Sequence, residues 1–409
     1  LSLGTAVLIN SNDNGQYLNV ASYNGDKSDH TAISDLAGGG IGSLVGAGRP
    51  AQDSMEKPIT VVWAAVKNQF FASIYTPEKP GTGVIIKRLD LTKESPFPDS
   101  AKPNVAITGA ARFDPPALEP NGSFRLAGML YVGPKEYRRL SHFGHDEDKV
   151  MQYDAFFFNR IFLSGYIAPF LNTLLNATHR WVGNWGVAVI LMTLILKLVS
   201  VPFTFAASRS AKRMAKLQPE MQALRTKFKD NPQKQQAATM ELFKKHKVNP
   251  VGGCLPVLIT MPLFIGFFAM LQGPAELRFA HFLWAPDLSA PDTVARVFGF
   301  PINIMPLLMG ATMIFQMRLT PTPTVDNAQM KMMKFMPLIF IVFCYNFSCA
   351  LSLYSTINGL FTIGQQLVIN RMKDPADAGP AGAGTAAATT VAGLRKGMKN
   401  VTPKKSDKR

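Results

Sequence analysis

The chain has 409 residues, a formal net charge of +16 at pH 7 and 47% apolar residues, and this length suffices for about two to four ordinary domains. Its three cysteines, Cys254, Cys344 and Cys349, all lie in apolar stretches, which excludes a disulfide framework or a cysteine metal site and predicts small packing residues. Residues 1–154 hold 15 basic and 17 acidic residues, whereas the remainder holds 28 basic and 10 acidic residues together with the long apolar runs. This pairing indicates a membrane protein with basic cytoplasmic segments.

Residues 1–154 read as a β domain. Short runs rich in β-branched and aromatic residues, separated by Pro, Gly and Asn clusters, cover 59–75, 83–91, 104–113 and 123–133. Strands at this spacing predict an all-β sandwich and argue against βαβ units. The chain opens at Leu1 without a charged and apolar signal pattern, so we expect that an upstream anchor or signal is missing from this sequence.

Two short motifs in this domain have alternative interpretations. GGGIGSLVGAG (38–48) resembles a phosphate-binding loop, but its G-x-G-x-x-x-G spacing lacks a strand–helix context, which favours a plain loop. HFGHDEDK (142–149) brings together two histidines and three acidic residues, so a weak metal site is conceivable. We favour a solvated loop that closes the domain.

Residues 155–183 are apolar but are interrupted by Arg160 and Pro169. Five apolar residues recur at helical spacing and predict one apolar face: Ile167, Phe170, Leu171, Leu174 and Leu175. We predict an amphipathic helix that lies in the membrane interface, which keeps the β domain on the outer side. A membrane-spanning helix here would place that domain in the cytoplasm, and the distribution of positive charge allows both topologies.

The stretch WGVAVILMTLILKLVSVPFTFAA (185–207) is long enough to cross a bilayer at about 1.5 Å per residue, and Lys197 lies near its middle. A charged side chain there costs about 2.5–3.5 kcal/mol on insertion scales. No Asp or Glu occurs in any predicted span to neutralise it. Snorkelling is one interpretation, and a water-filled groove that receives the ammonium is the favoured one. A single cation suits the attraction of polar or acidic groups, whereas a coupled pump requires carboxylate relays.

Residues 208–249 form a strongly basic segment. The basic side chains that we single out in it are Arg209, Lys212, Arg213, Lys216, Arg225 and Lys227, and the family resemblance described below implies that they contact a protein being inserted or the ribosome. A narrow apolar seam and the stop-and-start signal at Asp230-Asn231-Pro232 predict two antiparallel helices, hence a charged cytoplasmic hairpin.

The end of the chain, residues 374–409, is predicted to be a disordered basic tail, because 375–394 are rich in Ala, Gly, Pro and Thr. The basic residues that we single out at its end are Lys404, Lys405, Lys408 and Arg409. Two interpretations stay open, a solvated tail near anionic lipid or a contact with ribosomal RNA phosphates.

Further apolar stretches predict four more spans. Residues 251–271 and 297–317 are each long enough to cross the membrane. Phe335 to Asn370 is an uncharged run of 36 residues, which as one helix would reach about 54 Å, well beyond a bilayer core of about 30 Å. It therefore predicts two spans, 335–347 and 350–371, joined by a turn at 346–349. With 185–207, the predicted membrane core (184–373) has five spans.

Several motifs are similar to those of the bacterial YidC membrane protein insertases, of the YidC/Oxa1/Alb3 family. They are NPVGGCLPVLITMPLF (249–264), KLQPEMQALR (216–225), KFMPLIFIVF (334–343), WAAVKNQFFASIY (63–75), LYVGPKEYRRL (130–140) and VGNWGVAVI (182–190). The resemblance covers about residues 59–373. It implies an α-helical polytopic core of five transmembrane helices with a groove open to the cytoplasm and lipid, an all-β periplasmic sandwich domain and a cytoplasmic hairpin. It also implies a bacterial inner-membrane location and a preceding first transmembrane helix that this sequence lacks.

The resemblance also implies roles for single residues. The family's groove carries a positive residue, usually Arg, at the position of Lys197, and Thr193, Met261 and Phe264 match further groove positions. Lysine keeps the charge but loses the bidentate fork of arginine. The last turn lacks the family's usual Pro-Ser-Gly. Because Ser355 stands where an aromatic residue is common, Tyr354 is the nearest candidate for an aromatic substrate contact.

The implied function is that of an insertase and chaperone for inner-membrane proteins, without enzymatic activity, cofactor, metal or nucleotide. The expected partners are nascent membrane proteins, the ribosome, the Sec translocon and the phospholipid bilayer. The alternative is a transporter or channel that uses the same groove, against which the lack of internal repeats counts. A scaffold that only assists folding is a third possibility.

Overall fold

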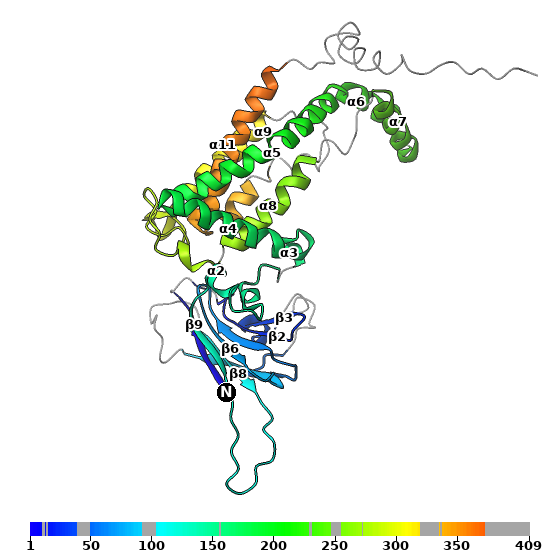
Figure 1. Ribbon diagram of the computed structural model, residues 1–409. Helices are drawn as coiled ribbons and strands as arrows, with labels where there is room; N and C mark the ends of the chain where they lie inside the picture. The colour runs from blue at the N-terminus through cyan, green and yellow to red at the C-terminus, as the bar shows by residue number, and fades with distance from the viewer. Residues whose placement is uncertain are drawn as a thin grey trace, which may run out of the picture.

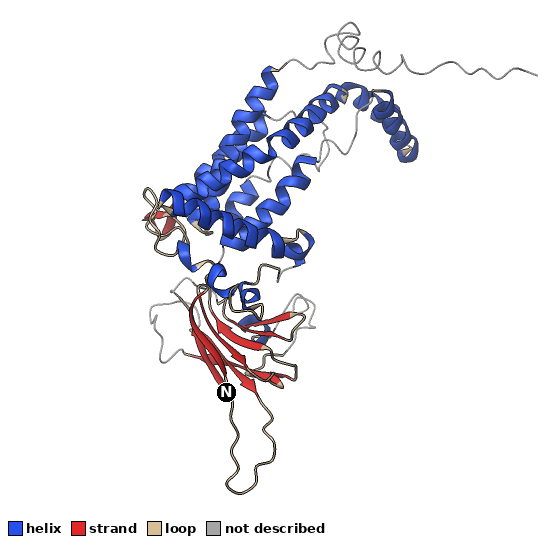
Figure 2. Cartoon of the chain, viewed as in Figure 1, coloured by secondary structure: helices blue, strands red, loops and turns tan. Residues whose placement is uncertain are grey.

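The computed structural model describes residues 1–9, 13, 15–38, 50–91, 104–154, 157–228, 231–246, 255–271, 273–319, 335 and 338–372. A β domain occupies the N-terminal part, and a bundle of helices follows it (Figures 1 and 2). Most of the glycine-rich motif 38–48 and all of the tail from 373 onward lie outside the described residues.

The β domain contains two antiparallel sheets (Figure 2). A four-stranded sheet has the order β1-β8-β7-β4, and a five-stranded sheet has the order β3-β2-β5-β6-β9. The strands are β1 (Ser2–Val7), β2 (Asn19–Tyr23), β3 (Ser28–Ala32), β4 (Ser54–Lys57), β5 (Trp63–Lys67), β6 (Phe71–Pro77), β7 (Gly83–Asp90), β8 (Val105–Arg112) and β9 (Gly128–Pro134). The predicted run 59–75 is two strands, because the Asn68 carboxamide accepts hydrogen bonds from the Phe70 and Phe71 amides at 3.1 and 2.9 Å and forms a tight turn.

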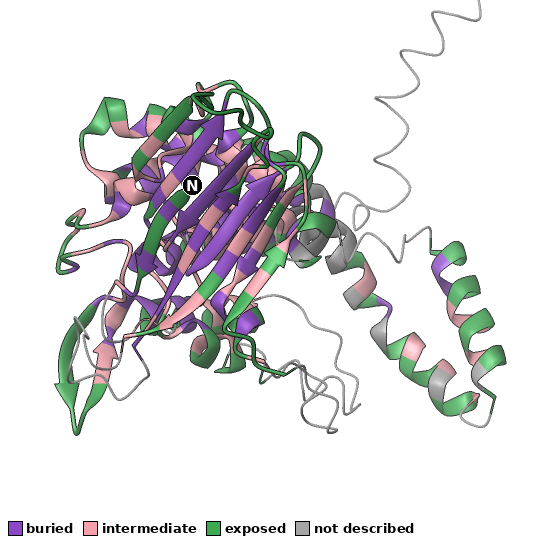
Figure 3. Ribbon diagram, turned by 90° about the horizontal axis from the view of Figure 1, so that it is seen from below, coloured by how far each residue is buried: buried purple, intermediate pink, exposed green. Residues whose placement is uncertain are grey.

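The two sheets pack face to face, as the sandwich predicted from the strand spacing requires. A Cβ added at Gly109 of β8 would lie 2.8 Å from Val66 Cγ2 and 3.0 Å from Val20 Cγ2, so glycine permits the close approach of the sheets. Strand β5 is buried on both faces. Figure 3 shows long buried stretches, in purple, along strands of the β domain. Ala64 and Val66 face the sandwich core, whereas Trp63 and Ala65 belong to a second cluster with residues 140–153 and the helices. The sheet is therefore the platform on which the helical half rests.

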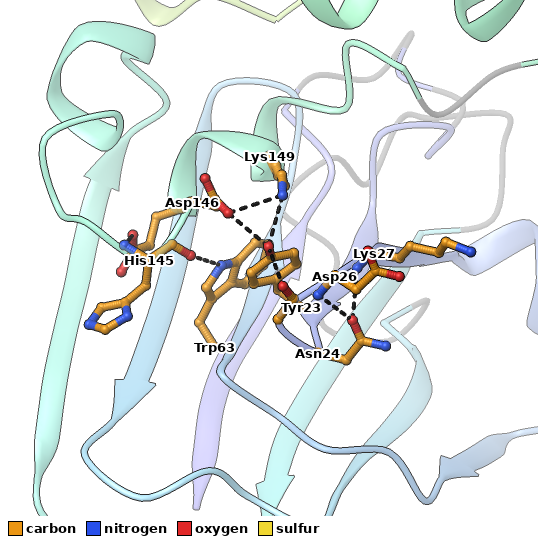
Figure 4. A network of polar contacts seen from close by, with 10 residues as sticks. Tyr23, Asn24, Asp26, Lys27, Trp63, His145, Asp146 and Lys149 are labelled. Carbon is orange, nitrogen blue, oxygen red and sulfur yellow. Dashed lines mark hydrogen bonds and ion pairs between the residues drawn. The ribbon is translucent and has the colours of Figure 1, made fainter.

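A polar network fastens the segment 142–152 to this sheet (Figure 4). The Tyr23 hydroxyl donates to Asp146 Oδ2 at 2.7 Å, and the Lys149 ammonium donates to the Tyr23 oxygen at 2.9 Å and to the same carboxylate at 3.1 Å. The Trp63 indole N–H donates to the His145 carbonyl at 3.0 Å. Asp146 thus serves as a hydrogen-bond acceptor, as does Glu147, which accepts from the Thr76 hydroxyl at 3.0 Å and the His145 amide at 2.8 Å. The described residues include no group of three or more His, Cys, Asp or Glu that could hold a metal.

The Asp146 network predicts a dependence of stability on pH. Hydrogen bonds from Tyr23 and Lys149 lower the pKa of the Asp146 carboxyl. A carboxyl whose pKa is lower in the folded protein stabilises it above the unfolded pKa, and this contribution is lost as the pH falls through the folded pKa. We expect Asp146→Asn to lower the free energy of unfolding at pH 7 by less than about 1 kcal/mol, because the Asp146–Lys149 ion pair is exposed. The change is measured as a lower melting temperature of the full chain in detergent. The difference should vanish well below about pH 3.9; an equal difference at both pH values would contradict this.

The second half of the chain is helical. Its helices are α3 (Phe157–Ile161), α4 (Ser164–Val182), α5 (Trp185–Lys216), α6 (Gln218–Lys227), α7 (Pro232–Lys245), α8 (Leu255–Leu271), α9 (Ile304–Leu319) and α11 (Cys349–Arg371), and residues 338–344 are also helical. Short elements are α1 (Ile33–Leu36), α2 (Tyr137–Leu140), η2 (Glu147–Met151) and η4 (Ala275–Leu277). Among the described residues, one helical stretch, Trp185–Phe205, is long and apolar enough to cross a membrane, and Thr260–Leu271 and Ile304–Leu319 are shorter apolar helices.

Helix α4 lies at the end of the bundle nearest the β domain (Figure 1). Ala168, Leu171 and Leu175 are buried, and α4 packs against α8 and α5. Phe170, a member of the predicted apolar face, is exposed. The reason is that α4 buries the stripe 168–171–175, and Phe170 lies about 100° away from Leu171 around the helix. Apolar side chains thus cover both the buried and the exposed sides of α4.

Two boundaries differ from the prediction. Helix α5 continues without a break from Trp185 to Lys216, so the basic hairpin does not begin with a new helix at 208. The predicted span 297–317 starts too early, because β10 (Thr293–Val297) and β11 (Phe300–Asn303) form an antiparallel hairpin and α9 begins at Ile304. The hairpin turn places Phe298 and Gly299 at φ 51° and 81°, a left-handed conformation that a helix excludes.

The long uncharged run is interrupted at 345–348, and α11 begins at Cys349. The Phe347 amide donates to the Cys344 carbonyl at 3.0 Å, and the Cys349 amide donates to the Ala290 carbonyl at 2.8 Å. The turn needs neither Pro nor Gly because the loop 287–290 supplies carbonyl acceptors for the first amides of α11.

Candidate functional site

Lys197 lies on α5 and points toward α11. Its side chain is only 7% exposed, and its ammonium donates to the Thr362 hydroxyl oxygen at 2.9 Å. On the opposite side of the same helix, Leu198, Val199 and Phe203 are exposed, as expected of side chains that face lipid. No ion pair joins Lys197 to a carboxylate anywhere in the described ranges. The helix therefore has one apolar outer face and one polar face that carries an uncompensated cation.

A polar seam joins α5 to α11 on this face. Two turns further along α5, the Thr204 hydroxyl oxygen accepts from the Gln365 amide nitrogen at 2.7 Å. The hydroxyls of Thr204 and Thr362 donate to carbonyls of their own helices, at 3.0 Å to Ser200 and at 2.7 Å to Asn358. Because these donations use the hydroxyl protons, both oxygens can only accept from the neighbouring helix. The two cross-helix bonds are the points at which the seam is held closed.

The other predicted positions on α5 and α11 are placed near this seam but are buried to different degrees. Thr193 is buried, one turn before Lys197, and donates to the Val189 carbonyl at 2.7 Å. Tyr354 is buried, and its ring stacks on Phe267 of α8 with a centroid distance of 3.7 Å. Ser355 is partly buried, and its hydroxyl has no hydrogen-bond partner among the described residues. A contact between Tyr354 and a client requires α8 and α11 to separate.

The two predicted positions on α8 lie one turn apart. Met261 is exposed and Phe264 is partly buried. The Phe264 ring contacts Phe340 at a centroid distance of 5.5 Å and lines a cavity between the helices and the β domain. Phe264 thus belongs both to the helical core and to the wall of that cavity, and the motif match did not predict its place in the cavity wall.

Comparison with known proteins bears on this arrangement. A family model described as 60Kd inner membrane protein matches residues 177–376, which contain α5 to α11 and the Lys197 seam. The chain is 41% identical over 259 residues to the membrane protein insertase YidC of Pelobacter propionicus, covering 62% of this chain and 46% of that protein. It is 38% identical over 310 residues to the YidC of Burkholderia multivorans, covering 76% and 51%.

The chain belongs to the YidC family. It spans about half the length of the curated YidC relatives that it matches. A crystal structure titled "Active YidC insertase crystal structure with the first transmembrane domain resolved" is 19% identical, covers 82% of this chain and 79% of that chain, and has a TM-score of 0.39. Since the YidC relatives are named insertases, the alternative of a transporter or channel is not supported.

The basic hairpin of this YidC family member extends from the end of α5, away from the β domain (Figure 1). Leu217 and Phe243 are buried between α6 and α7, and Met214 and Met221 pack against them. Asn231 caps α7 by accepting from the Lys234 amide at 3.0 Å, with Pro232 in the first turn, as the stop-and-start signal predicted.

The predicted basic contacts are distributed over these helices. Arg209, Lys212, Arg213 and Lys216 lie on the last two turns of α5, and Arg225 and Lys227 lie on α6. The Lys227 ammonium lies 5.5 Å from the ring centre of Phe228. The tail residues Lys404, Lys405, Lys408 and Arg409 lie outside the described residues.

Thr362 and Gln365 are the site residues that sequence reasoning did not single out. A signal for them exists, because Lys197 and Thr204 are seven residues apart on α5 and Asn358 and Gln365 are seven apart on α11. Two polar residues that are two helical turns apart lie on the same face of their helix. The polar faces of two apolar helices pack together when their side chains can form hydrogen bonds with each other. The register between the helices, which decides the pairing, is not contained in either helix alone.

Proposed function

We propose that this protein is a membrane protein insertase, which takes short hydrophobic segments with polar outer tails into the bilayer without a nucleotide and without enzymatic chemistry. The observation that carries this proposal is Lys197, a buried cation that pairs with no acidic side chain among the described residues. It lies on the one described helix of this YidC family chain that is long and apolar enough to cross a membrane. The chaperone role, in which the same surface assists folding and assembly of the client, follows from the same groove.

The proposed topology has five spans, near 185–207, 251–271, 304–319, 335–347 and 350–371, in an inner membrane. The β domain and the basic hairpin lie at opposite ends of the helical bundle, which supports their placement on opposite sides of a bilayer (Figure 1). The excess of Lys and Arg in the hairpin supports its placement in the cytoplasm and the β domain's placement in the periplasm. The exposed apolar side of α4 supports a position in the outer interface.

The proposed mechanism is the opening of the seam between α5 and α11. Breaking the Lys197–Thr362 and Thr204–Gln365 bonds exposes an ammonium, two hydroxyls and an amide to water from the cytoplasmic side. These groups hydrate a groove that shortens the apolar path, and the cation attracts the acidic or polar tail of the client. Once the hydrophobic segment has left for lipid, the two bonds form again.

The proposed partners follow from charge and location. Nascent membrane proteins enter the groove, and the phospholipid bilayer receives them. The hairpin residues and the basic tail contact the ribosome through its phosphates. The Sec translocon is a proposed lateral partner for clients with larger outer domains.

Site-specific photo-crosslinking to a ribosome-bound nascent chain tests the proposal. A crosslinker at Thr193 or Tyr354 should label a stalled hydrophobic client, because these buried residues lie on α5 and α11, the two helices that form the seam. A crosslinker at Val199, on the lipid-facing side of α5, is the matched control and should label phospholipid in preference to the client. Equal client labelling from all three positions would contradict entry through this seam.

A further inference from the structure

A cavity of about 1300 Å³ lies between the β domain and the helical bundle. It is larger than the range of about 300–1,000 Å³ that holds most small ligands. Its walls come from β3, the segment after β9, α3, α8 and residues 343–347. It contains none of the α5 or α11 residues of the Lys197 seam, so it is a separate site.

The two sides of this cavity differ in chemistry. The β domain and α3 supply basic and polar side chains, among them His30, Lys135 and Arg160. The helices supply aromatic rings, including Phe268 and Phe347 with centroids 5.3 Å apart, and Phe343, whose ring is 5.1 Å from Phe347. A ligand that fills this space needs a polar end toward the β domain and an apolar end toward the helices.

The polar side contains nitrogen atoms without partners. Lys135 is 3% exposed, and among the described residues no acceptor or carboxylate pairs with its ammonium. Both ring nitrogens of His30 are buried and lack partners within the described ranges. Burial lowers the pKa of Lys135 to about 7, and burial with the nearby Lys67 and Lys135 charges lowers the pKa of His30. Unpaired buried donors of this kind are costly and call for an acceptor.

The acidic side chains on the cavity wall do not supply that acceptor. The Asp13 carboxylate accepts from the Ile9 and Gly15 amides at 3.2 and 2.9 Å. Asp29 forms an ion pair with Lys57, and Asp35 accepts from the Ala32 amide at 2.9 Å. Each acid is therefore engaged within the β domain, and an external anion is left to meet Lys135 and His30.

We infer that this cavity binds an anionic membrane lipid, with the headgroup phosphate at Lys135 and His30 and an acyl chain along the wall of Phe268, Phe343 and Phe347. The orientation is that of a lipid in the outer leaflet, because the polar wall belongs to the β domain and the apolar wall to the helices. The inference depends on the location of the helices in a membrane and does not depend on insertase activity.

Thermal melting of the delipidated full chain in nonionic detergent tests this inference. Added phosphatidylglycerol should raise the melting temperature of the wild type, and phosphatidylcholine, whose headgroup has no net charge, should not. Lys135→Met should weaken phosphatidylglycerol binding by about tenfold or more, as expected for a lost hydrogen bond to a charged group. Lys87→Met, on an exposed residue of β7 outside the cavity, is the matched control and should bind as the wild type does.

Several results would overturn the inference. They are equal stabilisation by both lipids, an unchanged response in Lys135→Met, or stabilisation by inorganic phosphate that matches the lipid, which would indicate a free-anion site. Displacement of the lipid by an apolar peptide that then binds more tightly would indicate a polypeptide ligand instead.

A second measurement uses the wild type alone, so it does not depend on the folding of a variant. Phosphatidylglycerol with a photoreactive acyl chain should label peptides that contain Phe268 or Phe347. Labelling confined to the lipid-facing positions Leu198 to Phe203 of α5 would also overturn the inference.

Discussion

Replacement of Lys197 by glutamate is expected to reduce membrane insertion of a small client by about tenfold or more, whereas Lys197→Arg should retain most of the activity. An attractive charge pair at about 4 Å is worth about 1–4 kcal/mol in surroundings between bulk water and a protein surface, and reversal of the sign turns attraction into repulsion. Arginine keeps the charge and adds a bidentate fork. The measurement is the protease-protected fraction of a single-span client in proteoliposomes.

The folding of each variant is checked separately, because Lys197 also bonds Thr362 across the seam. Lys197→Met, which fills the same volume without charge, separates the loss of attraction from repulsion and should fall between the arginine and glutamate variants. Equal insertion by the arginine, methionine and glutamate variants, at equal amounts of folded protein, would remove charge attraction from the mechanism. A client with a basic tail should reverse the order of the three variants if attraction to the tail is the cause.

Gly359→Leu is expected to destabilise the bundle by about 1–3 kcal/mol, and more if the helices separate. A Cβ at Gly359 would lie 2.7 Å from Thr312 Oγ1 and 3.0 Å from Thr312 Cβ, so a larger side chain forces α11 away from α9. Because Gly359 lies three residues before Thr362 on α11, a shift of this helix also disturbs the Lys197–Thr362 bond, and we expect a several-fold loss of insertion. The measurement is the melting temperature in detergent together with the insertion assay.

Gly364→Leu is the control for this prediction, since it lies on the same helix, five residues further on, with nothing within 4 Å of an added Cβ. The two variants share the gain in helix propensity over glycine, about 1 kcal/mol, and differ in packing. Gly364→Leu should melt at or above the temperature of the wild type. If Gly359→Leu is as stable as Gly364→Leu, the contact between α9 and α11 does not hold the bundle together.

The β domain was predictable from sequence because its information is local. Short runs rich in β-branched and aromatic residues between turn clusters indicate strands. The burial of Lys67 in β5 (WAAVK) was not predictable in this way, because a lysine usually marks an exposed position. The same reasoning failed at 297–303, where the predicted span begins but the chain forms the turn and second strand of the β10–β11 hairpin. Only the left-handed pair Phe298-Gly299 distinguishes the two, and a Phe-Gly pair alone does not predict that conformation.

The candidate site was predictable in part. Lys197 is conspicuous because a charge in a 21-residue apolar stretch is expensive wherever it points. Its partner was not predictable, because Thr362 is 165 residues away and any of several hydroxyls could have served. For Tyr354, the residue was predictable from sequence but its surroundings were not. A motif match predicts which residue occupies a position, but whether its ring is open or stacked on Phe267 depends on the packing of α8.

The uninterrupted course of α5 has a mechanical consequence. A helix of 32 residues is a rod about 48 Å long, and it carries Lys197 near its middle and the basic hairpin at its far end. Pro202 lies between them and leaves the Leu198 carbonyl without its helical donor, so the rod bends most easily one turn from Lys197. A force applied to the hairpin would therefore bend α5 near Pro202, close to the Lys197–Thr362 hydrogen bond that closes the seam.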